Sequence, residues 1–204
     1  SRTMVAKFFV GFFMVSSLLF SEKWEKEKME DGITVWTRSI AGSKIKQVKA
    51  YTVIKQNPDI IWAGLQETDK FLKVMPNVVK KEDFEKCGEN CKLTFQKIHK
   101  PPLEDRVYVI KVQWKREESP DGKIVIHHTY KHVKGHAKAK GGLEVKNIFG
   151  RWGLISDDGQ KTKFTYVNHV DLGGMVPAGL VNSSLSENAF KFLKQLRAAS
   201  PKWK

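Results

Sequence analysis

Cysteine is scarce in this sequence: Cys87 and Cys91 are the only two among 204 residues, and no histidine pair lies at a matching spacing nearby. Two thiols alone make too few ligands for a structural zinc site, so we expect no metal and no cofactor. Gly88, Glu89 and Asn90 separate the cysteines between two strand-like runs, and glycine and asparagine favour a hairpin connection. At the base of a short hairpin the two cysteines can reach disulfide distance, which agrees with an exported protein in an oxidising compartment.

Signatures of catalysis and of nucleic-acid binding are also missing. We find no serine-centred nucleophile elbow, no metal-ligand set and no pair of carboxylates on one inward face, and only His128 offers an acid or base. Zinc-finger spacing, RNP patterns and basic zippers are absent, although 36 lysines and arginines against 22 acidic residues give a net charge of +14. The lysines are spread along the chain, which favours an anionic membrane surface as partner over nucleic acid.

No acidic residue precedes Glu22, and Arg2 and Lys7 come before an apolar run at 8–20. As a helix this run reaches about 20 Å, short of the roughly 30 Å hydrocarbon core of a bilayer, so a full transmembrane span is disfavoured. The pattern predicts a secretory signal with Ser21 at the cleavage point, although Leu19 departs from the preferred small residue. The alternative is a helix of the mature protein. We therefore divide the chain into an expression remnant plus signal-like segment at 1–21 and one domain at 22–204.

The rest of the chain alternates short strands with few helices. Pro58 favours the first turn of a helix capped by Asn57, and Pro177 begins a long helix near the end of the chain. The patterns predict a helical turn at 23–29, a short helix at 69–74, and strands near 33–38, 44–55, 78–86, 92–99, 106–117, 123–131, 142–155 and 162–172. Strands joined by hairpins form an antiparallel sheet, so we expect an α+β fold of the helix-grip kind, a curved sheet wrapped around the long C-terminal helix.

An arginine begins the apolar face of the strand at 106–117. Arg106, Tyr108, Ile110, Val112 and Trp114 occupy alternate positions, and side chains two apart project from the same face of a strand. A charge on that face is costly without a partner. Either another side chain supplies the partner, or the strand lines a cavity whose ligand or water does.

Helix and strand faces converge on one candidate cavity. The stripe Val181, Leu185, Ala189, Phe192 and Leu196 of the last helix must pack on the sheet. Arg106, His128 and Asn168 are expected to be polar points in otherwise apolar surroundings. For His128 and Asn168 a role as a hydrogen-bonded core residue is the alternative. The predicted ligand-binding residues are Arg106, Trp114, His128, Tyr130, Tyr166, Asn168, Val181, Leu185, Ala189 and Phe192.

The order of elements and several motifs resemble the START domain, the lipid-transfer module related to the steroidogenic acute regulatory protein. The resemblance covers most of residues 22–200. It is carried by DGITVWTR at 31–38, the segment at 93–109 with its proline-rich turn and arginine, and KTKFTY at 161–166 followed by DLGGMVP at 171–177. The family commonly has an aspartate at the position of Val107, so the local partner of Arg106 is left open.

The resemblance implies a tunnel for one lipid, covered by the C-terminal helix and by a loop before the penultimate strand. That loop corresponds to 131–142, which carries Lys131, Lys134, Lys138 and Lys140. We predict a mobile basic lid whose Lys134, Lys138 and Lys140 face the membrane. The alternative is a solvated surface loop.

The predicted function is to bind a single sterol, fatty acid or phospholipid and to carry or present it between membranes, without enzymatic activity. A helix-grip enzyme of the cyclase or hydrolase-like type is the alternative, and nucleic-acid or protein binding is a third. We expect a monomer of the bacterial exported type, in the periplasm or secreted.

Overall fold

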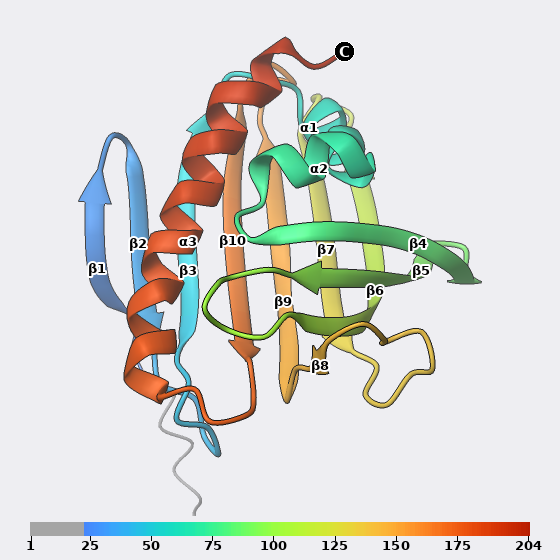
Figure 1. Ribbon diagram of the computed structural model, residues 1–204. Coiled ribbons are helices and arrows are strands. Elements are labelled where there is room, and N and C mark those ends of the chain that lie inside the picture. The colour runs from blue at the N-terminus through green and yellow to red at the C-terminus, as the bar shows by residue number, and fades with distance from the viewer. Residues whose placement is uncertain (1–22) are drawn as a thin grey trace, which may run out of the picture.

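Ten β-strands form one curved sheet in the computed structural model, which describes residues 23–204 (Figure 1). The sheet order is β1-β2-β3-β10-β9-β7-β6-β5-β4, and all neighbours on this path are antiparallel. The strands are β1 (Glu25–Glu30), β2 (Ile33–Arg38), β3 (Gln47–Ile54), β4 (Val78–Gly88), β5 (Cys91–Ile98), β6 (Arg106–Glu118), β7 (Ile124–His132), β8 (Leu143–Glu144), β9 (Asn147–Ser156) and β10 (Thr162–Asp171). The predicted α+β helix-grip fold is confirmed.

Helix α3 (Ala178–Ala199) crosses the inner face of the sheet, with α1 (Pro58–Gln66) and α2 (Thr68–Val74) at the end of the sheet near the C-terminus (Figure 1). The predicted stripe of α3 is buried, from Val181 to Leu196. Burying a leucine or phenylalanine stabilises a fold by about 1.5–3 kcal/mol, so this stripe is what holds the helix on the sheet. A short 3₁₀ helix, η1 (Ser200–Lys202), follows it.

Helix α1 begins as predicted. The side-chain oxygen of Asn57 accepts a hydrogen bond from the Asp59 amide at 2.8 Å, and Pro58 occupies the first turn, where a missing amide is harmless. Among residues 23–204, no helix is long and apolar enough to cross a membrane. The signal-like segment at 1–21 lies outside the described residues.

The helical turn predicted at 23–29 is wrong, because this segment forms strand β1. Asp31 and Gly32 both have positive φ, 53° and 70°, the conformation that a tight two-residue hairpin turn requires. Glu30 is paired with Ile33 directly across this turn. The backbone hydrogen bonds to β2 therefore outweigh the helical propensity of the lysines and glutamates.

The single strand predicted at 142–155 is divided in two. The amide of Val145 donates to the carbonyl of Val107, whereas the amide of Lys146 donates to the carbonyl of Asp171. The chain thus leaves β8, which pairs parallel to β6, and joins β9 beside β10. Because the successive residues Val145 and Lys146 pair with different strands, β6 and β10, the predicted strand is interrupted between them.

The loop at 133–142 does not cover the interior, so the prediction of a lid is wrong. Val133 and Ala139 pack on an outer apolar cluster formed by Phe95, Val107 and Val109. These three side chains lie on the face of the sheet opposite α3, and they hold the loop there. Lys134, Lys138 and Lys140 are exposed, and Lys138 pairs with Glu82 at 2.9 Å.

The predicted disulfide is present. Cys87 at the end of β4 and Cys91 at the start of β5 are bonded, with their Cα atoms 5.0 Å apart. The bond closes the β4–β5 hairpin at its tip.

We expect the double variant Cys87→Ser/Cys91→Ser to lose about 2 kcal/mol at most in the free energy of unfolding, because the closed loop is short. Denaturant titration with and without reductant measures this loss. Reductant should weaken the wild type and leave the double variant unchanged. Two free thiols, found by alkylation of the unfolded wild type without reductant, would contradict the bond.

Candidate functional site

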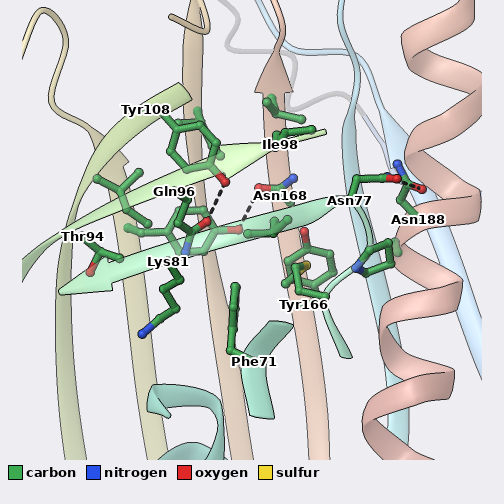
Figure 2. A pocket seen from close by; sticks show the side chains of 18 of the residues that line it. Phe71, Asn77, Lys81, Thr94, Gln96, Ile98, Tyr108, Tyr166, Asn168 and Asn188 are labelled. Carbon is green, nitrogen blue, oxygen red and sulfur yellow. Dashed lines mark hydrogen bonds between the residues drawn. The ribbon is translucent and has the colours of Figure 1, made fainter. Parts of the chain in front are cut away.

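A cavity lies between the inner face of the sheet and helices α2 and α3 (Figure 2). The space within it that the centre of a water-sized sphere can occupy is about 130 Å³. Its wall is mainly apolar. The apolar side chains include Val48, Leu65, Phe71, Met75, Val78, Ile98, Ile110, Val112, Ile148, Trp152, Val170, Leu172, Val181, Leu185 and Ala189.

Strand β6 shows how the sheet builds this wall. Tyr108, Ile110 and Val112 line the cavity, whereas Val107 and Val109 belong to the outer cluster. The predicted alternation is confirmed for these positions, because successive side chains of a strand point to opposite faces.

Seven of the ten predicted ligand-binding residues line the cavity. They are His128, Tyr130, Tyr166, Asn168, Val181, Leu185 and Ala189. Strands β7 and β10 and helix α3 bring these side chains together. Their contact with a ligand stays a prediction.

Arg106 is buried but does not line the cavity, which corrects its predicted position. Its Nε donates to the carbonyl of Leu172 at 2.9 Å, and its Nη1 donates to the carbonyl of Glu104 at 2.5 Å. Two backbone carbonyls thus partner the guanidinium. The hydrogen bond to Leu172 connects the start of β6 to the residue that follows β10. Arg106 therefore joins two segments of the chain beside the cavity.

Trp114 and Phe192 also lie outside the cavity wall. The Trp114 ring packs against Trp62 of α1, with ring centroids 5.4 Å apart, because α1 covers this end of β6. The Phe192 ring is fully buried and contacts Tyr166 at 4.9 Å and Phe164 at 6.0 Å between ring centroids. Both side chains fill space beside the cavity.

His128 is held by aromatic side chains. Its ring is stacked on Trp152 with centroids 4.0 Å apart, and its Nδ1 accepts a hydrogen bond from Trp62 Nε1 at 3.2 Å. Burial, with the positive charges of Lys92 and Lys81, lowers the pKa of His128 to about 3. The ring is therefore neutral near pH 7, and because Nδ1 accepts, its proton is on Nε2.

Two tyrosines orient two amides in the cavity. The Tyr108 hydroxyl donates to Gln96 Oε1 at 2.6 Å, and the Tyr130 hydroxyl donates to Asn168 Oδ1 at 2.7 Å (Figure 2). Burial raises the pKa of both tyrosines, so these hydroxyls stay protonated. Both amide oxygens are occupied, and the two amide nitrogens donate to no side chain or backbone carbonyl within residues 23–204.

Sequence analysis missed two lysines that line the cavity, Lys81 on β4 and Lys92 on β5. Their side chains are only 4% and 14% exposed, and their Nζ atoms lie 3.2 and 2.8 Å from Asp83 Oδ2. Lys81 Nζ also donates to the backbone carbonyl of Gln66, and Lys92 Nζ to its side-chain oxygen. Thr94 donates to Asp83 Oδ1 at 2.7 Å.

Burial and the neighbouring charge of Lys92 lower the pKa of Lys81. Burial raises the pKa of Asp83, but hydrogen bonds from Lys92 and Thr94 outweigh it, so that this pKa is lowered overall. Asp83 is thus the ionised partner shared by two ammonium groups. We call Lys81, Lys92 and Asp83 the lysine cluster.

A β-bulge places Lys81 in the cavity. The β4–β5 register shifts between Val78 and Lys80, so Val78 and Lys81 both face inward. Lys80 instead lies over the Phe95 ring on the outer face, 5.6 Å from its centroid. On β5 the sequence does alternate between polar and apolar residues. Its inner positions, however, are the polar Lys92, Thr94 and Gln96, a pattern that is typical of a strand face exposed to solvent.

Within residues 23–204, no three histidine, cysteine, aspartate or glutamate side chains lie close enough together to hold a metal ion. The cavity wall combines apolar side chains with amides, hydroxyls and the lysine cluster.

Comparison with known proteins connects this architecture to lipid-transfer modules. The family model of the START domain matches residues 97–203. An uncharacterized protein from Pseudomonas aeruginosa is 29% identical over 195 residues, covering 93% of this chain and 93% of that protein.

Solved structures share the fold. A STAR-related lipid transfer protein from Xanthomonas axonopodis has a TM-score of 0.74 at 24% identity, covering 88% of this chain and 99% of that one. Human StAR-related lipid transfer protein 5 has a TM-score of 0.72 at 18% identity, covering 88% and 86%. The Zhui aromatase/cyclase from a Streptomyces species has a TM-score of 0.51 at 13% identity, covering 76% and 93%.

The buried His128 predicts a pH dependence of stability. Because its pKa is about 3 in the folded chain and about 6.5 in the unfolded chain, the unfolded state binds more protons between these values. Its contribution is complete above about pH 6.5 and is lost as the pH falls, by about 1.4 kcal/mol per pH unit. Denaturant titrations from pH 7 to pH 4 should therefore show a smaller slope for His128→Asn than for the wild type.

His127→Asn is the matched control, because His127 is the exposed neighbour on β7. Its slope should equal that of the wild type. Equal slopes for His128→Asn and the wild type would contradict the buried neutral histidine.

Proposed function

Because the chain belongs to the START domain family, we propose that it binds one hydrophobic lipid in the cavity and carries it between membranes. The observation that carries this proposal is the mainly apolar cavity between α3 and the sheet. An apolar wall with a few placed polar groups is the usual composition of a small-molecule site. Two of the structures that share this fold are named as lipid transfer proteins, which supports the same function here.

We propose a carrier and not an enzyme. His128 is the acid or base that the sequence offered, and its pKa of about 3 makes it a weak base at neutral pH. Its Nδ1 is also occupied by the hydrogen bond from Trp62. The likeness to an aromatase/cyclase extends to the fold alone.

The membrane is the proposed donor and acceptor of the lipid. With a net charge of +14, the chain is attracted to anionic bilayers, where each basic residue near the surface contributes about 1 kcal/mol. Lys134 and Lys140 are exposed at one end of the sheet, as that role requires. We propose that the protein acts as a monomer.

Export is the proposed location. The Cys87–Cys91 disulfide supports an oxidising compartment, the periplasm or the exterior. The apolar run that precedes the described residues supports the same proposal through its resemblance to a secretory signal.

Filling the cavity should abolish lipid binding. Ala189 is 1% exposed and lines the cavity from α3, so Ala189→Trp puts a large ring where the ligand would lie. We expect its affinity for a fluorescent fatty acid or sterol to fall at least about tenfold, measured by fluorescence titration.

Ala198→Trp is the control, because Ala198 is exposed on the same helix and away from the cavity. It should bind like the wild type. If a folded Ala189→Trp variant, verified by circular dichroism, binds with unchanged affinity, the cavity is not the binding site.

Charge at the loop should set the rate of transfer. We expect Lys134→Glu/Lys140→Glu to transfer a fluorescent lipid more slowly between anionic vesicles while retaining its affinity, and salt to slow the wild type. Lys138 is left unchanged because it pairs with Glu82. Lys55→Glu/Lys161→Glu makes the same charge change at two exposed positions outside the loop, directly after β3 and directly before β10. Equal rates for both double variants would exclude the loop as the membrane-facing element.

A further inference from the structure

The lysines of the cavity are not matched by carboxylates in its wall. Lys81, Lys92 and Lys100 line it, and no aspartate or glutamate of the described residues does. Asp83 lies behind the two buried lysines, with a side chain that is 36% exposed. Two ammonium groups and one carboxylate leave the lysine cluster with one positive charge in excess.

One ammonium group of the lysine cluster retains a free donor. An ammonium carries three N–H donors. Lys81 Nζ donates to three acceptors, the Gln66 carbonyl and both oxygens of Asp83, whereas Lys92 Nζ donates to Asp83 Oδ2 and Gln66 Oε1. Lys92 therefore has one N–H left beyond these bonds, on a side chain that forms part of the cavity wall.

Several other polar groups of the wall offer donors. Gln96 and Asn168 have their oxygens occupied by tyrosine hydroxyls, which leaves their N–H groups. His128 presents Nε2–H, because its Nδ1 accepts from Trp62. A donor that lacks an acceptor is unfavourable in an apolar site, and a ligand oxygen that reaches it removes that cost.

From this arrangement we infer that the ligand is an anionic amphiphile whose carboxylate or phosphate head is bound by Lys81 and Lys92, with its apolar chain along the α3 side of the cavity. The inference rests on the proposed function and adds the chemical class of the lipid. An oxyanion supplies an acceptor for the free N–H of Lys92 and neutralises the excess charge that Lys81 and Lys92 share. A neutral sterol or alcohol supplies at most a hydroxyl.

The test compares ligands that differ only in charge. cis-Parinaric acid and its methyl ester are titrated by fluorescence against the wild-type protein. We expect the acid to bind at least about tenfold more tightly, since hydrogen bonds to charged groups exceed those to neutral ones. Displacement of the acid by palmitic acid, by single-chain lysophosphatidic acid and by hexadecanol then distinguishes a carboxylate, a phosphate and a neutral head.

Removing a lysine and removing the carboxylate should change the affinity for the acid in opposite directions, which separates loss of ligand recognition from misfolding. Lys81→Met and Lys92→Met keep the apolar stems and should each weaken binding of the acid about tenfold while leaving the ester unchanged. Asp83→Asn removes the competing carboxylate and should strengthen binding of the acid several-fold. Lys80→Met is the matched control on β4, because Lys80 lies on the outer face.

Equal affinity of acid and ester in the wild type overturns the inference and leaves the proposed function intact. Equal losses for acid and ester in the lysine variants, with no gain in Asp83→Asn, also overturn it. Binding of neither probe by the wild type overturns the proposed lipid cavity itself, and the inference with it.

Discussion

The packing of α3 on the curved sheet is the constraint on which the rest of the structure depends. Its C-terminal half is packed closely, with Phe192 against the rings of Tyr166, Phe164 and Trp152. The part of the helix up to Ala189 faces the cavity through Val181, Leu185 and Ala189. The large rings fix the distance between helix and sheet, and the smaller side chains cannot fill the space that remains. One helix thus closes a core at one end and leaves a mainly apolar cavity at the other.

Much of this architecture could be predicted from local patterns. The strands from 33 to 171, the capped helix at Pro58 and the stripe on α3 follow from alternation, turn residues and helical spacing, and their boundaries differ by a few residues from the structure. Four of the predicted residues that line the cavity follow from period two of strands β7 and β10, and the other three from the helical spacing of α3. Arg106 was placed on the inner face by the same rule, but its backbone partners come from segments near 104 and 172 that periodicity does not bring together.

The remaining features depend on contacts between distant segments. Strand β5 packs against the loop at 133–142 on its outer face and lines the cavity on its inner face. Its apolar residue Phe95 therefore lies on the outer face, and its polar residue Thr94 on the inner one. A pattern of polar and apolar positions cannot tell a solvated face from a polar cavity wall. The β1 hairpin was missed for a similar reason, because strand pairing decided the structure of a segment with helical propensity.

The bulge in β4 makes the set of side chains inside the cavity tolerant of a change in chain length. Val79 is the residue left out of the pairing, while Lys80 lies opposite Lys97 and Lys81 opposite Gln96. Deleting Val79 would therefore restore regular pairing and leave both lysines on their present faces. In a regular strand the loss of one residue would instead move every side chain beyond it to the other face. Related chains can thus differ in length at this point of β4 and still present the same charge to the cavity.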